Sequence, residues 1–228
     1  MADSLSAVAA EVVACRRCPR LVAWREQAAR ERPARFRDDA YWARPLPSFG
    51  DSRARLLVLG LAPAAHGGNR TGRIFTGDRS GDWLFRALHR AGFANQPASV
   101  SADDGLRLRD CIVAAVVRCA PPVNRPLPGE RDNCIGYLER ELRLLFRLRV
   151  VVALGEFAWD NALRAAASLG ATVRPKPRFG HGATARLGSW WLIGSYHPSQ
   201  QNTFTGKLTQ QMLDEVFAAA RARLAPNE

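Results

Sequence analysis

Lysine is almost missing from this chain of 228 residues: Lys176 and Lys207 are the only lysines among 33 basic residues. The formal net charge of +12 therefore comes almost wholly from arginine. Arginine makes forked contacts with phosphate, and a strong positive field attracts anions, so the composition favours a polyanion such as nucleic acid as partner. A solvated surface of an arginine-rich protein is the alternative explanation.

Long apolar runs are also missing. No stretch approaches the roughly 18 apolar residues that a membrane-spanning helix needs, which argues against a membrane protein. Asp3 and Glu11 stand where a secretory signal requires positive charge, so we expect a cytoplasmic protein. Internal repeats and linker-like tracts are absent as well. We therefore expect a single domain over residues 1–228, a length sufficient for one buried core, acting as a monomer.

Apolar strands without polar alternation follow one another along the chain, separated by helical patterns, which is typical of an α/β protein. Strands of this kind are covered on both faces. We expect a three-layer α/β/α sandwich around a short, mainly parallel four-stranded sheet. The expected strands are residues 55–61, 111–117, 149–154 and 190–195, and the expected helices are residues 80–91, 128–146, 155–169 and 206–224. Residues 30–51 are expected to form a long surface excursion.

Three loops at the carboxyl ends of these strands have an unusual composition. They are "GLAPAAHGGNRTGRIFTGDRSGDWL" after the first strand, "RCAPPVNRP" after the second and "YHPSQQNTFTGKLT" after the last. Ligands of parallel sheets bind at this edge. The first loop lacks both the Lys-Ser/Thr of a P-loop and the G-x-G-x-x-G pattern, which argues against a nucleotide phosphate cradle. We expect this loop to form the wall of a pocket.

The five cysteines do not indicate a disulfide framework, because nothing in the sequence indicates secretion. Cys15 and Cys18 form a C-x-x-C pair, whose two thiolates can face one metal centre. Cys119 ends an apolar strand, and Cys134 follows a proline-rich loop that can fold back to complete the site. Cys111 opens the same strand and is typical of a small core residue. Four cysteines are therefore candidate metal ligands, and unlinked structural cysteines are the alternative.

Four motifs together carry a resemblance to a known family: "CRRCPRLVAWRE", "GLAPAAHGGNRTGRIFTGD", "VRCAPPVNRP" and "SYHPSQQNTFTGKLT". In this order the chain resembles the type-5 (B-type) uracil-DNA glycosylases, the iron-sulfur branch of their superfamily. The resemblance implies an α/β/α sandwich and a four-iron four-sulfur (4Fe-4S) cluster as cofactor. It also implies base excision repair, in which uracil in DNA is removed by hydrolysis of its N-glycosidic bond after base flipping.

The resemblance implies roles for three residues in particular. Phe75, in the F-T-G-D stretch, is expected to stack on the extruded base, and a core phenylalanine is the alternative. Asp78 is expected to act on the water or the sugar cation, with capping of the following helix as the alternative. His197 is expected to donate a hydrogen bond to the base carbonyl that gains charge during cleavage, and a structural histidine is the alternative.

Further residues are expected to complete the substrate site. Pro198 and Ser199 resemble the family's minor-groove wedge. Asn124 matches an asparagine that contacts the flipped nucleotide, and a turn asparagine is the alternative. Gly60 lets the backbone approach a ligand closely. Ala62 stands where several other branches place an Asp, Asn or Glu that helps water attack the sugar, an absence that type-5 enzymes share.

The first loop also supplies the residues expected to engage DNA phosphates, namely Asn69, Arg70 and Arg73. In the strand before the second loop, Ala115 stands where type-4 enzymes carry an asparagine that reads the uracil edge. A pocket without that asparagine discriminates less strictly between bases. We therefore expect hypoxanthine and other deaminated bases to be accepted besides uracil.

Two other classes of protein share parts of this pattern. A metal-dependent nuclease needs several carboxylates that converge on one site, whereas these loops offer chiefly Asp78 and Asp82. A non-enzymatic iron-sulfur DNA-binding protein needs the cysteines and arginines but no pocket. Both stay open as alternatives to the glycosylase.

Overall fold

The fold is built on a six-stranded sheet in the order β1-β3-β2-β4-β6-β5, of which the four inner strands are parallel. The computed structural model describes residues 3–225. Each inner strand lies within a range expected from the sequence, and every residue of β2, β3 and β4 is buried, as strands covered on both faces require. The inner strands are β3 (Cys111–Ala115), β2 (Leu56–Gly60), β4 (Val150–Leu154) and β6 (Trp190–Ser195).

Two short antiparallel strands extend this sheet at its edges. β1 (Phe49–Gly50) pairs with β3, and β5 (Thr184–Leu187) pairs with β6. The expected number of four strands is therefore wrong by two. β1 contains only two residues, and β5 alternates between exposed and buried positions, so neither forms the continuous apolar run that marks the inner strands.

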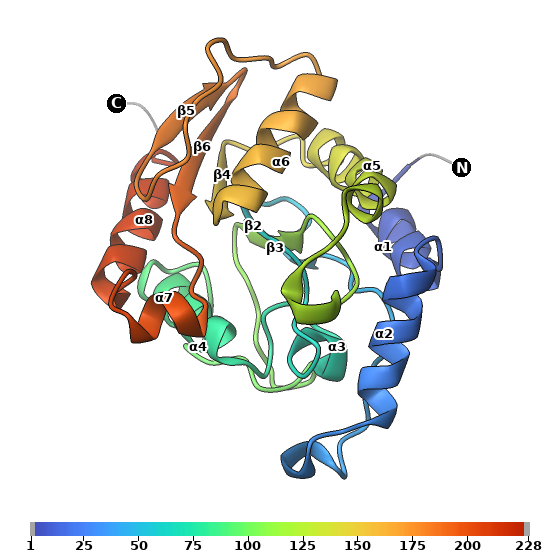
Figure 1. Ribbon diagram of the computed structural model, residues 1–228. Coiled ribbons are helices and arrows are strands. Elements are labelled where there is room, and N and C mark those ends of the chain that lie inside the picture. Colours follow the sequence, from blue (N-terminus) through green and yellow to red (C-terminus); the bar gives the residue numbers. More distant parts are fainter. Residues whose placement is uncertain (1–2, 226–228) are drawn as a thin grey trace.

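Helices cover both faces of the sheet, which confirms the expected three-layer α/β/α arrangement (Figure 1). Successive strand side chains point to opposite faces. Leu57 and Leu59 of β2 accordingly pack in the cluster that contains α5 and α6, whereas Leu56 and Val58 pack with α4 and α8. These four helices are α4 (Arg79–Arg90), α5 (Pro128–Leu144), α6 (Glu156–Ser168) and α8 (Gln210–Ala222), and each lies within a range expected from the sequence, apart from the first residue of α4.

Four further helices and two 3-10 turns complete the fold of the described residues. Among them, α1 contacts α5, and α2 ends where residues 30–51 begin. The sequence patterns above do not predict any of these helices. They are α1 (Leu5–Ala14), α2 (Pro19–Arg30), α3 (Gly68–Thr71) and α7 (Gln200–Phe204), with 3-10 turns η1 (Ala34–Phe36) and η2 (Pro122–Asn124).

Residues 30–51 form a surface excursion in part only. Residues 32–44 project from the body of the protein, whereas Leu46 is buried and its N–H donates to the carbonyl of Arg118 at 2.8 Å. β1 then joins the sheet. Within residues 3–225, no helix has the length and apolar character needed to cross a bilayer.

Candidate active site

The three unusual loops meet at the carboxyl edge of the sheet and line one pocket of about 560 Å³. The loop after β2 contributes residues 61–64, 74–75 and 78–80, the loop after β3 contributes Asn124, and the loop after β6 contributes residues 197 and 199–201. Parallel strands bring their carboxyl ends together, which is why segments so far apart in sequence share one site.

Phe75 lines this pocket, and two glycines pack closely against it. Its backbone has a φ of 54°, a left-handed conformation that is rare for bulky residues and typical of functional sites. A Cβ at Gly60 would lie 2.7 Å from Cζ of the Phe75 ring, so this ring packs directly on the backbone of Gly60. A Cβ at Gly81 would overlap the Phe75 carbonyl oxygen. Only glycine at both positions permits this placement.

His197 lies across from Phe75, with 5.9 Å between the two ring centroids and a tilt of 31°. Desolvation by the surrounding protein lowers the pKa of His197 to about 4, so the imidazole is neutral at pH 7. A neutral imidazole has one N–H donor and one acceptor nitrogen. The side-chain amide of Asn202 donates to the His197 carbonyl at 2.9 Å and holds the loop in place.

Asp78 combines both roles that its sequence context allows. It is the N-cap of α4, where its Oδ1 accepts a hydrogen bond of 2.9 Å from the N–H of Gly81, and it also lines the pocket. Its carboxylate lies against Gly67, where a Cβ would overlap it. Burial raises the pKa of Asp78, because a desolvated carboxylate is less stable in its charged form. The carboxyl group is therefore a stronger base than an exposed aspartate.

Pro198 and Ser199, the residues expected to form a wedge, lie in the loop after β6. Pro198 is buried, and Ser199 lines the pocket while its Oγ caps α7 by accepting from the N–H of Asn202 at 3.3 Å. Their role as a minor-groove wedge stays a prediction, because it concerns contact with DNA. Among the described residues near the pocket, Val123 and Phe204 are the exposed large apolar side chains, at 80% and 67%.

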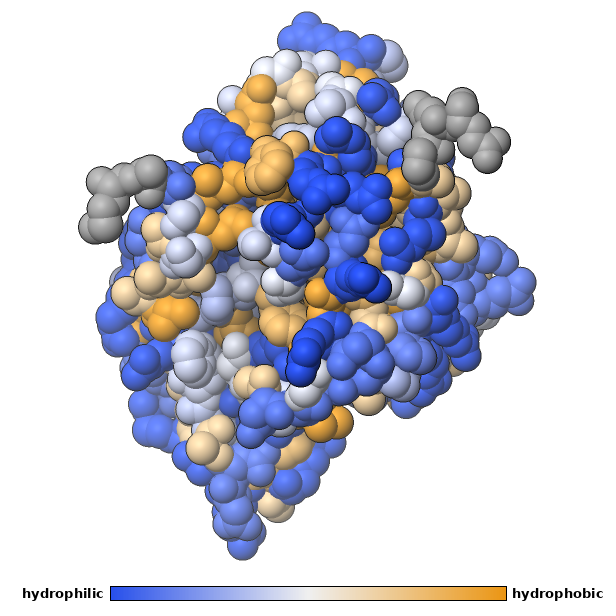
Figure 2. All heavy atoms as spheres, turned by 180° about the vertical axis from the view of Figure 1, so that it is seen from behind, coloured by the Kyte–Doolittle hydropathy of each residue, from blue (hydrophilic) through white to orange (hydrophobic). Residues whose placement is uncertain are grey.

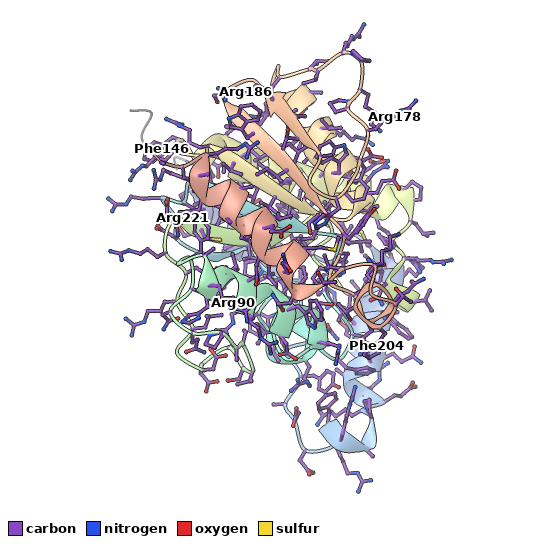
Figure 3. All side chains as sticks on the ribbon, turned by 90° about the vertical axis from the view of Figure 1, so that its left-hand side faces the viewer. Arg90, Phe146, Arg178, Arg186, Phe204 and Arg221 are labelled. Carbon is purple, nitrogen blue, oxygen red and sulfur yellow. The ribbon has the colours of Figure 1, made fainter. Side chains whose placement is uncertain are left out.

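Phe204 is a residue that the sequence motifs did not single out. It ends α7, whose first turn lines the pocket, and the guanidinium of Arg79 stacks on its ring at 4.4 Å (Figure 3). Arg79 itself lines the pocket. On the opposite rim, Asn124 is exposed and has a φ of 55°, which fits the tight turn expected as its alternative role. Asn124 therefore both occupies a turn and lines the pocket.

Asn69 and Arg73 lie inside the protein, which corrects the expectation that they contact phosphates. The side-chain amide of Asn69 is fully buried and donates to the carbonyl of Arg25 at 3.1 Å. Arg73 is 5% exposed and forms a salt bridge of 2.6 Å with Asp104, together with hydrogen bonds to Ser99 and neighbouring groups. The side-chain donors of both residues thus bind groups within the protein.

Arg70 is also engaged within the protein. Its guanidinium forms a salt bridge of 2.6 Å with Asp39 and donates to the carbonyls of His66 and Gly77 at 2.9 and 3.1 Å. The same group stacks on the ring of Phe36 at 4.1 Å. Arg70 therefore joins the pocket loop to residues 36–39. Because these contacts occupy its guanidinium, its expected role as a phosphate ligand is corrected as well.

The four candidate metal ligands line one cavity between α2, the loop after β3 and α5. Cys15 and Cys18 come from the turn before α2, Cys119 from the loop after β3, and Cys134 from α5. Cys111 is fully buried in β3, and this burial raises the pKa of its thiol, in agreement with a core role. Within the described part of the chain, no three His, Cys, Asp or Glu side chains are grouped closely enough to hold a single metal ion.

A buried arginine adjoins this cysteine cavity. Arg25 of α2 is 2% exposed, and its Nη1 donates to Sγ of Cys119 at 3.0 Å, while its Nε has no hydrogen-bond partner among the described residues. The side-chain amide of Asn133 donates to Sγ of Cys18 at 3.4 Å. A cation without a carboxylate partner is costly to bury. Burial raises the pKa of the Cys119 and Cys134 thiols, so they are neutral without a metal. Thiolates that bind a metal centre would offset the cost of burying Arg25, so the surroundings fit a negatively charged cofactor.

Comparison with known proteins identifies the family. Residues 47–221 match the model of the Uracil DNA glycosylase superfamily. The chain is 56% identical to the type-5 uracil-DNA glycosylase of Mycobacterium bovis over 96% of this chain and 82% of that protein. It is 52% identical to the type-5 uracil-DNA glycosylase of Thermus thermophilus over 94% of this chain and 95% of that protein.

A solved structure shares the fold at much lower sequence identity. The crystal structure of wild-type SMUG2 from Pedobacter heparinus superposes with a TM-score of 0.50 and 12% identity, over 75% of this chain and 76% of that one. At this identity the likeness concerns the arrangement of the sheet and its helices.

Proposed function

The chain belongs to the type-5 branch of the uracil-DNA glycosylase superfamily, and on that basis we propose that it removes uracil from DNA by hydrolysing the N-glycosidic bond. The observation that carries this proposal is the pocket in which Phe75, Asp78 and His197 meet. A glycosylase must hold a base that has left the stack, stabilise the departing base and tolerate a cationic sugar. The pocket provides one group for each task.

The base is held on Phe75 and leaves with help from His197. An extruded uracil stacks on the Phe75 ring, which gives affinity without dependence on base sequence. As the bond between C1′ and the base nitrogen breaks, the electron pair moves onto the base and negative charge gathers on its carbonyl oxygen. The neutral imidazole of His197 donates a hydrogen bond to that oxygen, a contribution of a few kcal/mol when the donor is fixed in advance.

Asp78 acts on the sugar and on the attacking water. As the base departs, positive charge develops on the sugar, and the negative carboxylate stabilises it. The raised pKa makes the same group a better acceptor for the proton of the attacking water. Capping of α4 holds Oδ1 in place while this chemistry proceeds. Asn124 and Ser199 also line the pocket and can contact the nucleotide there.

The range of bases is part of the same proposal. Leu61, Ala62 and Pro63 line the pocket with side chains that have no hydrogen-bonding group. Rejection of a wrong base depends on polar groups that stay unpaired when it binds, and these side chains provide none. Hypoxanthine and other deaminated bases are therefore accepted besides uracil. The protein acts as a cytoplasmic monomer of one domain.

A 4Fe-4S cluster held by Cys15, Cys18, Cys119 and Cys134 completes the proposal. Support comes from the single cavity that these cysteines line and from the buried charge of Arg25 beside it, which has no carboxylate partner among residues 3–225. A cluster on four thiolates joins α2, the loop after β3 and α5 into one unit. Its role is to organise these segments, since hydrolysis of a glycosidic bond needs no electron transfer.

One assay tests the reaction directly. The protein is incubated with duplex DNA that contains one uracil, once in EDTA and once with added magnesium, and with a matched duplex that contains thymine. We expect free uracil and an intact backbone from the first duplex and no release from the second. Strand scission that requires magnesium would indicate a nuclease instead. Binding without any release would indicate a non-enzymatic DNA-binding protein.

The nuclease alternative has little support in the pocket itself. Two-metal hydrolysis needs several carboxylates on one site. Among the described residues that line the pocket, Asp78 carries the only carboxylate.

A further inference from the structure

A basic segment outside the pocket projects from the same side of the protein as α3 and α7 (Figure 1). We call residues 32–44, which follow α2, the arm. Figure 2 shows the tip of this projection as predominantly hydrophilic surface. The arm precedes residues 47–221, the part of the chain that matches the superfamily model. The base pocket common to the superfamily therefore does not explain it.

Four arginines of the arm are exposed, and none of them forms an ion pair with another described residue. Asp39 is neutralised by Arg70 at 2.6 Å, so Asp38 is the arm's only acidic side chain outside such a pair. A group of free guanidinium charges on one projection attracts anions. The four residues are Arg32, Arg35, Arg37 and Arg44.

Three of these guanidinium groups are ordered by the arm's own aromatic rings. Stacking on a ring reduces the conformational freedom that a guanidinium loses on binding, and it leaves the N–H edge available for phosphate. In Arg32, Nε and Nη1 donate to the carbonyls of Ala29 and Arg37 at 2.7 and 3.2 Å, so this side chain is held in place and keeps only part of its N–H edge for phosphate. This arrangement differs from a flexible basic tail. The stacked pairs are Arg35 on Phe36 at 4.7 Å, Arg32 on Tyr41 at 5.5 Å and Arg44 on Trp42 at 5.6 Å.

The arm is fastened to the loop that forms the pocket wall. The hydroxyl of Tyr41 and Nδ1 of His66 lie 2.9 Å apart, and the N–H of Trp42 donates to the carbonyl of Arg70 at 2.9 Å. The N–H of Ala43 donates to the carbonyl of Asn69, the residue before Arg70, at 3.0 Å. Residues 66–70 continue directly from residues 61–64, which line the pocket. The position of the arm is thus coupled to that of the pocket.

We propose that the arm binds the phosphate backbone of duplex DNA beside the extruded nucleotide, an inference that rests on the proposed function. DNA presents a dense row of negative charges, and the arm presents fixed guanidinium groups on the side of the pocket. Contacts of this kind set the register of the protein on the duplex and carry no sequence information. They replace the phosphate contacts first expected from Asn69, Arg70 and Arg73.

The test compares two charge-matched variants. Arg35→Gln/Arg37→Gln removes two charges from the arm, and Arg178→Gln/Arg186→Gln removes two exposed charges at the opposite end of the molecule (Figure 3). Dissociation constants are measured against salt concentration on a duplex of about 30 base pairs, roughly three helical turns, that holds an abasic-site analogue. Melting temperatures confirm that both variants are folded.

We expect the arm variant to reduce the slope of log affinity against log salt by up to about 1.8, since each neutralised phosphate contributes about 0.9. The control variant is expected to keep the slope of the unsubstituted protein. Equal slopes for both variants, or no change in either, would overturn the proposal. The binding measurement does not depend on base release, so failure of the uracil assay and failure of this inference are separate results.

Discussion

The rings of Phe75 and His197 lie 5.9 Å apart and belong to loops that follow different strands, β2 and β6. This pair defines the space in which a flipped base can be held, with stacking from one side and a hydrogen-bond donor from the other. The geometry depends on the backbone of Gly60, on which the Phe75 ring rests. A change at Gly60 therefore tests the pocket without altering any group that takes part in the chemistry.

Gly60→Ala is expected to slow uracil release by roughly tenfold, equivalent to about 1.4 kcal/mol of lost transition-state stabilisation. The new Cβ would lie 2.7 Å from the Phe75 ring and must displace it. Overpacking of this kind also lowers the free energy of unfolding by about 1–3 kcal/mol. Single-turnover rates and denaturant unfolding measure the two effects.

Gly136→Ala is the matched control for that experiment. Gly136 lies inside α5, and no atom lies within 4 Å of the position its Cβ would take. Alanine is favoured over glycine inside helices by about 0.5–1 kcal/mol, so stability is expected to rise slightly and the rate to stay the same. A wild-type rate in Gly60→Ala would show that the position of the Phe75 ring is not critical.

Asp78→Asn separates the helix cap from the catalytic charge. Asparagine caps helices about as well as aspartate, so α4 is expected to keep its N-terminus. The rate on uracil is expected to fall by on the order of a hundredfold, or about 2.7 kcal/mol, because the charge that stabilises the sugar cation is lost. An unchanged rate would leave Asp78 as a helix cap alone.

The same substitution has an expected effect on stability. A carboxyl group whose pKa is raised in the folded state binds more protons there than in the unfolded chain, so its contribution to stability falls as pH rises above its ordinary value. Removal of the charge is therefore expected to leave the melting temperature at pH 7 equal or higher. A lower melting temperature at pH 7 would contradict this account of the raised pKa.

Much of this site could be predicted because regular patterns carry it. The continuous apolar runs of β2, β3 and β4 placed their carboxyl ends at one edge, and the loops that follow β2 and β3 do line one pocket with residues after β6. Long amphipathic segments such as α4 and α8 were predictable for the same reason. The edge strands were not, since pairing with a neighbour rather than an apolar run defines them.

The roles of Arg70 and Arg73 could not be read from their own loop. Arginine in a glycine-rich loop suggests a phosphate ligand, but each of these side chains pairs with an aspartate 31 positions away. The partners, Asp39 and Asp104, come close only through the tertiary fold.

The cofactor proposal predicts iron near four per chain in protein purified without chelators, with the brown colour of a cluster on four thiolates. Cys119→Ser is expected to lose iron and colour. Cys111→Ser is the control and is expected to retain both, since Cys111 is buried in β3, which forms no part of the cysteine cavity's lining. Metal analysis measures the iron content of each protein, and visible absorption measures the colour. One zinc per chain, or loss of colour only with Cys111→Ser, would reject the cluster.

His197 is expected to stay neutral across the physiological range, because desolvation lowers its pKa to about 4. The rate of uracil release should therefore show no inflection near pH 6.5, the ordinary pKa of histidine. A lowered histidine pKa means that the unfolded chain binds more protons between pH 4 and 6.5, so this group reduces stability as pH falls through that window. An inflection near pH 6.5 that disappears in His197→Ala would contradict the lowered pKa.

The base dependence of His197→Ala tests which atom the imidazole serves. In uracil, the departing negative charge gathers on a carbonyl oxygen that His197 can reach, whereas in hypoxanthine it spreads over a purine. His197→Ala is therefore expected to slow uracil release more than hypoxanthine release, while Asp78→Asn slows both alike because the sugar cation is common to them. Single-turnover rates of the two variants on both duplexes give the comparison. Equal losses on the two bases in His197→Ala would place its action away from the base carbonyl.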